Sequence, residues 1–156
     1  MNADQSFDFY VKSTWLAISR MYNQIAATYH STQAHGFVLI SIDKEEGTPS
    51  TKIAPLLGME PTGLTRVLKT LELQGLIYRK KDEHDKRIIR IFLTEKGLEK
   101  RKIAVSAVKG FNEHLMSCLS QHQFETFKRI MNIAGQCAED YKLKKLAEIN
   151  SNEQNN

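Results

Sequence analysis

The sequence predicts a mainly α-helical (α+β) fold, in which a small central unit carries a two-stranded β-hairpin and long helices lie at both ends. Three observations predict it. Apolar residues recur at spacings of three and four over residues 7–29 and again after residue 97. Near the middle of the chain, Ile89, Ile91 and Leu93 alternate with other side chains, as in a half-buried strand. Glycines and prolines divide the segment in between into short helices.

The first helix is expected over residues 7–29, because a narrow apolar seam runs along it. The seam consists of Val11, Trp15, Ile18, Tyr22, Ile25 and Tyr29. Thr32 is expected to cap a second helix that ends near Glu46-Gly47. The seam either packs on the chain's own core or meets a second copy, and we favour the second copy because the central unit offers little core to cover.

Two short helices follow a turn predicted at residues 48–50. Ser50 is expected to cap the third helix and Gly58 to end it, while Pro61 suits the first turn of the fourth helix. Pro55 lies inside the third helix, where it removes a backbone donor and leaves the angle between the two helices open.

A hairpin and two long helices complete the chain. The strands are expected at Ile77–Lys81 and Arg87–Leu93, joined by a polar loop in which Asp85 and Arg87 point the same way and can pair. Thr94 is a natural cap for the helix that follows. Residues 120–123 resemble a capping box that opens the last helix.

The charge of the chain is concentrated around the hairpin. The 156 residues are 41% hydrophobic and carry a net charge of +4. Residues 61–92 hold eight of the 22 cations but only four of the 18 acids, so the rest of the chain is balanced. A localised positive excess beside a hairpin favours a polyanionic partner. No membrane span or signal segment is evident, so a cytoplasmic location is expected.

The segment from residue 53 to residue 67 has the spacing of a helix-turn-helix. Ala54 is small where two helices cross, Gly58 takes the turn, and Leu64 and Val67 seat the second helix. This spacing is common by chance, but a basic hairpin follows it directly. The two together predict a winged helix-turn-helix.

With these residues identified, the chain resembles the MarR family of bacterial transcriptional regulators. Its wing motif, Asp-x-Arg followed by Leu-Thr-x-x-Gly, is met at Asp85, Arg87, Leu93, Thr94 and Gly97. The resemblance covers nearly the whole chain. It implies a single domain over residues 1–149, and the Asn-, Gln- and Ser-rich composition of residues 150–156 predicts a disordered tail. Within the domain, residues 32–97 would form the DNA-binding lobe, and residues 7–31 and 98–149 would form the helical dimerisation region.

The resemblance also implies the roles of individual residues in binding double-stranded DNA. The fourth helix would lie in the major groove and Arg87 in the minor groove, with Asp85 holding Arg87. Lys86 and Arg90 are expected to contact phosphates, whereas Arg79 is either a contact or a solvated strand residue. The full predicted set is Ser50, Thr62, Gly63, Thr65, Arg66, Lys69, Arg79, Asp85, Lys86, Arg87 and Arg90.

Members of this family often bind a small aromatic effector. Its pocket would be lined by Trp15, Tyr22, His35 and Phe37, although an ordinary core explains the same residues. Cys118 and Cys137 are expected to be core thiols. We expect no cofactor and no metal site.

Catalysis is not expected, because the chain has no Gly-rich phosphate loop, no nucleophile elbow and no HExxH motif. The sequence therefore predicts a homodimeric repressor at a pseudo-palindromic operator, associated with the bacterial nucleoid and relieved by an effector. The alternative is a winged-helix architectural or protein-interaction module.

Overall fold

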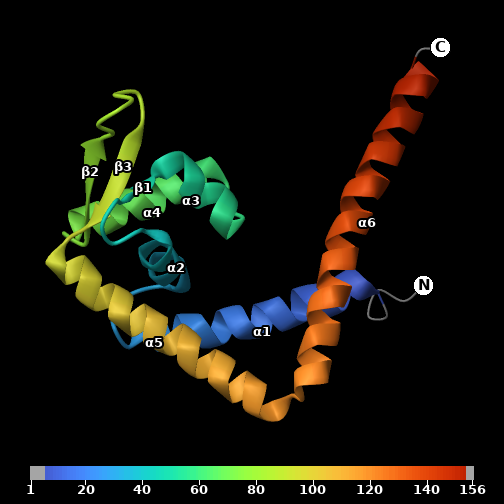
Figure 1. The fold of residues 1–156 in the computed structure, drawn as a ribbon, viewed down its shortest axis with the longest axis horizontal. Coiled ribbons are helices and arrows are strands. Elements are labelled where there is room, and N and C mark those ends of the chain that lie inside the picture. Colours follow the sequence, from blue (N-terminus) through green and yellow to red (C-terminus); the bar gives the residue numbers. More distant parts are fainter. Residues whose placement is uncertain (1–5, 154–156) are drawn as a thin grey trace. The chain divides into compact units, whose positions relative to one another are not determined.

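The computed structural model describes residues 6–153, and the chain divides into two compact units between Gly110 and Phe111 (Figure 1). The first unit contains α1 (Phe7–Ala27), α2 (Gln33–Ser41), β1 (Thr48–Pro49), α3 (Ser50–Leu57), α4 (Pro61–Leu73), β2 (Ile77–Lys81), β3 (Ile89–Leu93) and the start of α5 (Glu95–Cys118). The second unit contains the end of α5 and all of α6 (Gln121–Glu153).

Helices α2, α5 and α6 begin where the sequence predicts caps. The Thr32 hydroxyl accepts a hydrogen bond from the backbone N–H of His35 at 3.2 Å. Ser120 and Gln123 form a reciprocal capping box, with bonds of 3.2 Å to the Ser120 hydroxyl and 2.8 Å to the Gln123 side chain. The Thr94 hydroxyl accepts from the N–H of Gly97 at 3.0 Å. These local predictions are confirmed.

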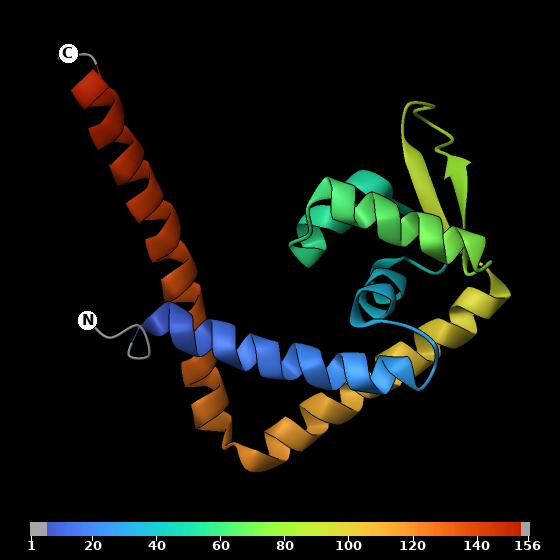
Figure 2. The same cartoon turned by 180° about the vertical axis from the view of Figure 1, so that it is seen from behind.

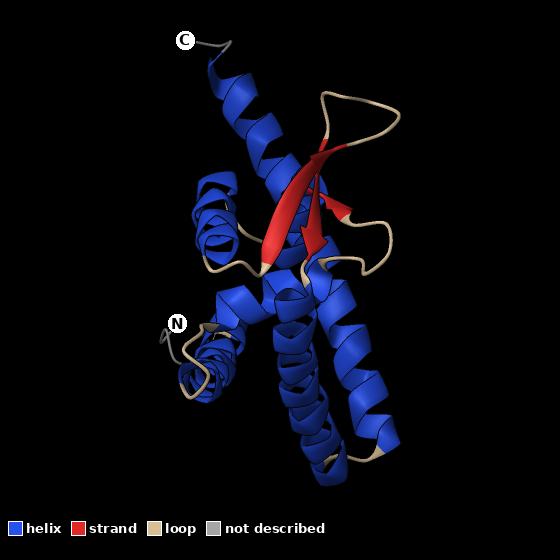
Figure 3. Ribbon diagram, turned by 90° about the vertical axis from the view of Figure 1, so that its left-hand side faces the viewer, coloured by secondary structure: helices blue, strands red, loops and turns tan. Residues whose placement is uncertain are grey.

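The sheet has three strands, so the prediction of a two-stranded hairpin was incomplete. The strands are antiparallel in the order β1-β3-β2 and are drawn in red in Figure 3. Pro49 lies opposite Arg90. Residues 48–50 were predicted as a turn, because a strand of two residues is too short for alternation to show. Ser50 is the first residue of α3 and not its cap, and Pro49 at the cap position offers no side-chain bond.

Other boundaries differ from the prediction by a few residues. Helix α2 ends at Ser41, because the Asp43 carboxylate accepts hydrogen bonds from the N–H groups of Glu45 and Glu46 and forms a turn instead. Helix α3 continues through Pro55. Helix α6 continues to Glu153, past the start of the predicted tail, and residues 154–156 lie outside the described part of the chain.

The core of the first unit is built from α2, α3, α4 and the sheet (Figure 2). Its buried members are Val38, Leu39, Ile42, Ile53, Ala54, Leu64, Leu68, Leu71, Leu76, Ile77 and Ile91. Ile91 is fully buried on the middle strand, while Ile89 and Leu93 pack on the same core, as the alternation predicts. This core fixes α4 against the hairpin.

The joint between the hairpin and α5 leaves no room for a side chain at Gly97. A Cβ atom on Gly97 would lie 1.9 Å from the carbonyl oxygen of Leu76. Thr94 holds the same junction, since its backbone N–H donates to that carbonyl at 3.1 Å and its hydroxyl donates to the carbonyl of Gly75 at 2.7 Å. The start of α5 is therefore seated directly on the chain that links α4 to β2.

Large apolar side chains remain exposed on the first and last helices. Those on α1 are Phe7, Phe9, Tyr10, Val11, Trp15, Leu16 and Ile25. Those on α6 are Phe127, Ile130, Ile133, Tyr141, Leu143, Leu146 and Ile149. Cys118 and Cys137 are also exposed, so the prediction of core thiols is wrong for the single chain. None of the helices within residues 6–153 has the length and apolar character needed to cross a membrane.

Candidate nucleic-acid interface

Helices α3 and α4 form the predicted helix-turn-helix. Ala54 is buried at the crossing, and its carbonyl accepts a hydrogen bond from the N–H of Met59 at 2.9 Å. Gly58 has a φ of +59°, a left-handed conformation that glycine adopts without strain. Leu64 is buried and Val67 packs against the core, so the second helix is seated as the spacing predicts.

The opposite face of α4 carries short hydroxyls and cations. Thr62, Thr65, Arg66 and Lys69 are all exposed. The Thr65 hydroxyl donates to the carbonyl of Pro61 at 2.9 Å, which orients it along the helix. Gly63 is not required by packing, since a Cβ there would come no closer than 3.9 Å to the Met59 side chain. The face is therefore polar, open and free of bulky side chains at its start.

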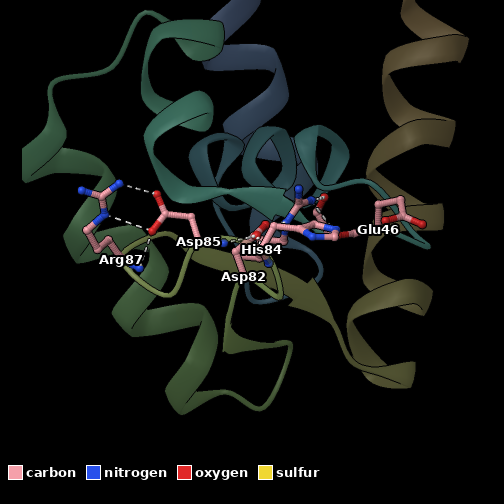
Figure 4. A network of polar contacts seen from close by, with 7 residues as sticks. Glu46, Asp82, His84, Asp85 and Arg87 are labelled. Carbon is pink, nitrogen blue, oxygen red and sulfur yellow. Dashed lines mark hydrogen bonds and ion pairs between the residues drawn. The ribbon is translucent and has the colours of Figure 1, made fainter.

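The wing tip, residues 82–88 between β2 and β3, presents Arg87 to solvent (Figure 4). The predicted pair with Asp85 is present: Arg87 Nε lies 3.0 Å from Asp85 Oδ1, and Nη2 lies 2.9 Å from Oδ2. The Arg87 guanidinium lowers the pKa of Asp85, and Asp85 in turn raises the pKa of Arg87. Yet the Arg87 side chain is 91% exposed, so a carboxylate orients a cation that remains accessible.

Arg90 differs from Arg87 in its surroundings. Its side chain is only 29% exposed and forms an ion pair with Asp82 through Nε. Its Nη1 donates to the carbonyl oxygens of Glu46 at 2.9 Å and Gly47 at 3.3 Å. The predicted phosphate contact by Arg90 therefore competes with three bonds inside the protein.

Asp82 is the residue that sequence reasoning missed. It is buried, and its Oδ1 accepts hydrogen bonds from the N–H groups of His84 at 2.9 Å and Asp85 at 3.0 Å. An aspartate that bonds the backbone two and three residues ahead is typical of a turn. Its place directly after a strand was the available signal, but its pairing with Arg90 was not visible in the sequence.

The ion pair of Asp82 makes the stability of the wing dependent on pH. Arg90, followed by the N–H groups of Asp85 and His84, holds the pKa of Asp82 far below its usual range. A carboxyl with a lowered pKa stabilises the fold above its unfolded pKa of about 3.9, and this contribution is lost as the pH falls toward the folded pKa. We expect Asp82→Asn to be less stable than wild type at pH 7, with the difference shrinking between about pH 4 and pH 2.

Urea unfolding measured across this pH range tests the prediction. Glu83→Gln is the matched control, since Glu83 is an exposed acid in the same loop. Its free energy of unfolding should follow the wild-type curve at every pH. A constant difference between Asp82→Asn and wild type down to pH 2 would contradict the role of the Asp82 charge.

The remaining predicted site residues lie in different settings. Lys86 is exposed at the wing tip, and Ser50 is half-buried at the start of α3. Arg79 Nε pairs with Glu72 Oε2 at 3.0 Å, which ties the beginning of the wing to the end of α4. This pair gives Arg79 a role within the protein besides any contact with DNA.

The four predicted pocket residues are only partly brought together. Tyr22 and Phe37 line an open, mostly apolar cavity between α1, α2 and α5, and their ring centroids lie 5.6 Å apart. Trp15 stacks on Phe37 at 6.4 Å but does not line the cavity. His35 does not line it either, and burial lowers the pKa of its side chain. The structure adds Ile40 and Val108 to the wall, residues that the sequence gave no reason to select.

Comparisons with known proteins agree with this geometry. The MarR family profile matches residues 31–89. The HTH-type transcriptional regulator TtmR of Methylorubrum extorquens is 34% identical over 94 residues, which are 60% of this chain and 48% of TtmR. The chain thus aligns with about half the length of TtmR.

Two solved structures share the fold. One is the complex of Staphylococcus aureus MepR with DNA, with a TM-score of 0.74 and 22% identity, covering 81% of this chain and 94% of MepR. The other is CouR from Rhodococcus jostii bound to p-coumaroyl-CoA, with a TM-score of 0.72 and 17% identity, covering 84% of this chain and 93% of CouR. These likenesses show a common fold.

The family follows from a longer match in sequence. The HTH-type transcriptional regulator SarZ of Staphylococcus aureus is 33% identical over 112 residues, which are 71% of this chain and 74% of SarZ. The match in sequence, the family profile and the winged helix-turn-helix agree, and the chain therefore belongs to the MarR family of transcriptional regulators.

Proposed function

We propose that the chain is a sequence-specific DNA-binding repressor that acts as a homodimer on a pseudo-palindromic operator in the bacterial cytoplasm, at the nucleoid. The observation that carries the proposal is Arg87, a nine-tenths exposed guanidinium held by Asp85 on the same lobe as the polar face of α4. A major-groove helix and a groove-reaching arginine in one compact unit are the parts that a winged helix-turn-helix needs to read DNA.

Arg87 is proposed to enter the minor groove beside the site that α4 reads. Narrow A·T-rich minor grooves concentrate negative potential and attract arginine. We expect Arg87→Ala to weaken binding most for operators with A·T-rich flanks and least for operators with G·C-rich flanks. Fluorescence anisotropy with paired oligonucleotides measures this, and equal losses on both flanks would contradict a minor-groove role.

The dimer is proposed from the apolar side chains exposed on α1 and α6. Large exposed apolar surfaces of this kind mark interaction sites, and aromatic residues are enriched in interface cores. We expect sedimentation equilibrium at micromolar concentration to give twice the mass of the chain, because a monomer would leave this apolar surface in water. Phe127→Glu should shift the equilibrium toward monomer, while Glu125→Lys, which exchanges one charged side chain for another on the same helix, should not. A stable wild-type monomer would exclude the proposed dimer.

A small aromatic effector is proposed to bind in the cavity lined by Tyr22 and Phe37. The apolar wall suits a ring-bearing molecule, and the cavity, which has a volume of about 60 Å³, would have to widen to admit one. CouR, which has the same fold, was solved with p-coumaroyl-CoA. Its binding would relieve repression by favouring a conformation of the chain other than the one that binds DNA.

Selection of bound fragments from the organism's own genome tests the proposed function. One enriched sequence with two-fold symmetry is expected, released when the right phenolic ligand is added. A regulator of this kind binds its site about 4–10 kcal/mol more tightly than unrelated DNA. The alternative, an architectural or protein-interaction module, predicts equal affinity for all fragments or no binding at all.

A further inference from the structure

We infer that Asp82 and Arg90 anchor the wing tip and so position Arg87, and that Arg90 acts through this anchor rather than by contacting DNA. The inference rests on the proposed function, because it concerns how the wing is presented to a DNA groove. It assigns a positioning role to Arg90, which was predicted from the sequence to contact phosphate. It assigns the same role to Asp82, which was not among the predicted site residues.

Arg90 joins three separate segments of the first unit. It belongs to β3, pairs with Asp82 at the end of β2, and donates to the carbonyl oxygens of Glu46 and Gly47 in the loop between α2 and β1. With 29% of its side chain exposed, its guanidinium faces these partners rather than solvent. A phosphate contact would have to break bonds that satisfy a half-buried charge.

Asp82 links Arg90 to the wing tip through bonds on both of its carboxylate oxygens. One carboxylate oxygen faces Arg90, and the other accepts from the N–H groups of His84 and Asp85. The Asp85 carboxylate in turn holds the Arg87 side chain and also accepts from the Arg87 N–H at 3.0 Å. Figure 4 shows Arg87, Asp85 and Asp82 following one another in this order, with Glu46 beyond them. Two carboxylates in series thus connect the half-buried Arg90 to the exposed Arg87.

The far end of the anchor is itself fixed. The N–H of Glu46 is held by Asp43 Oδ1 at 2.8 Å. Gly47 has a φ of +62°, and a Cβ there would lie 2.8 Å from the carbonyl oxygen of Ile91, so this loop is packed tightly on the middle strand. The carbonyls that accept from Arg90 therefore belong to a loop packed on the middle strand and not to the wing tip.

The substitution Asp82→Asn distinguishes the anchor from a general effect of charge on the affinity for DNA. Asp82→Asn removes a negative charge from the DNA-binding lobe, and Coulomb's law alone predicts tighter binding to a polyanion. The anchor predicts weaker binding, because a neutral amide holds Arg90 less firmly and the wing tip is then no longer held in one position. The sign of the effect thus decides between the two.

The experiment measures the affinity of the full chain for its selected operator, with A·T-rich and with G·C-rich flanks, at one salt concentration. We expect Asp82→Asn and Arg90→Met each to weaken the A·T-flanked operator about tenfold and to reduce the preference for A·T flanks, an effect equal to about 1.4 kcal/mol. The double variant should bind the operator no more weakly than either single variant, since both substitutions break the same interaction. In an Arg87→Ala background, Asp82→Asn should have little further effect.

Glu83→Gln is the matched control, because it removes a neighbouring exposed acid without touching the anchor. It should bind DNA as tightly as wild type or more tightly. If Asp82→Asn behaves like Glu83→Gln while Arg90→Met weakens binding, Arg90 is a phosphate contact and the anchor is refuted. Should Asp82→Asn fail to fold, Arg90→Lys replaces it: a phosphate contact would survive this change, whereas the anchor would weaken because lysine cannot reach Asp82 and two carbonyls at once.

Amide hydrogen exchange without DNA keeps the inference separate from the proposed function. The N–H groups of His84, Asp85 and Ile88 should exchange faster in Asp82→Asn than in Glu83→Gln, while those of α4 stay protected. Unchanged exchange overturns the anchor even if DNA binding is found. A wild-type chain that binds all DNA equally overturns the proposed function, whatever the exchange shows.

Discussion

Gly97→Ala is expected to destabilise the chain by at least about 3 kcal/mol, or to prevent folding. The new methyl carbon would lie 1.9 Å from the carbonyl oxygen of Leu76, a backbone atom that cannot rotate away. To make room, α5 would have to move off the junction that Thr94 holds with two hydrogen bonds to Leu76 and Gly75. Thermal unfolding followed by circular dichroism measures the loss.

Gly110→Ala is the matched control for this prediction. Gly110 lies in the same helix, and nothing comes within 4 Å of a Cβ atom built there. Alanine is the better helix former, so this change should stabilise the chain by up to about 1 kcal/mol. If the two substitutions have similar effects, helix propensity and not the close contact governs Gly97.

Arg66→Ala is expected to cost about 1–3 kcal/mol of binding free energy per half-site at the selected operator, and much less on unrelated DNA. Arg66 is exposed in the middle of the polar face of α4, where an arginine can form two hydrogen bonds with guanine in the major groove. The substitution removes no core contact, so stability should stay within about 0.5 kcal/mol of wild type. Titration of operator and scrambled DNA at the same salt concentration measures both affinities.

Lys86→Ala provides the contrast. Lys86 is an exposed cation at the wing tip. If it contacts a phosphate, its loss should weaken the binding of all DNA sequences equally and should lower the slope of log K against log salt concentration by about one. An Arg66 variant with the same uniform loss would show that α4 contacts only the backbone of DNA. If Arg66→Ala leaves the affinity for the operator unchanged, the assignment of α4 to the DNA interface is wrong.

Features that depend on neighbours in the chain were predictable from the sequence. Thr94 is a residue type that caps helices and Glu95 follows it, and these two neighbours predicted the start of α5; the Thr94 hydroxyl indeed accepts from the N–H of Gly97. Asp85 and Arg87 lie two apart on one side of the wing, and they pair as expected. The turn at Gly58 was predicted because a glycine interrupts the apolar pattern between Ala54 and Leu64, and its left-handed φ of +59° confirms it.

Features that depend on distant partners were not predictable. The carbonyl that receives Arg90 is 44 residues away in the chain, so nothing near Arg90 showed that its charge was already engaged. The strand at Thr48 exists only because Ile91 lies opposite it. The exposure of Cys118 and Cys137 has the same cause, since an apolar seam in the sequence does not show whether its partner is the same chain or another.

The order of the sheet, β1-β3-β2, also determines how this protein avoids unwanted assembly. One edge strand contains Pro49, which has no N–H to offer to an incoming strand. The other edge strand carries Arg79, Lys80 and Lys81, whose charges would repel an identical edge. Both edges thus disfavour the addition of a further strand, and this keeps the wings of neighbouring copies from joining into a continuous sheet.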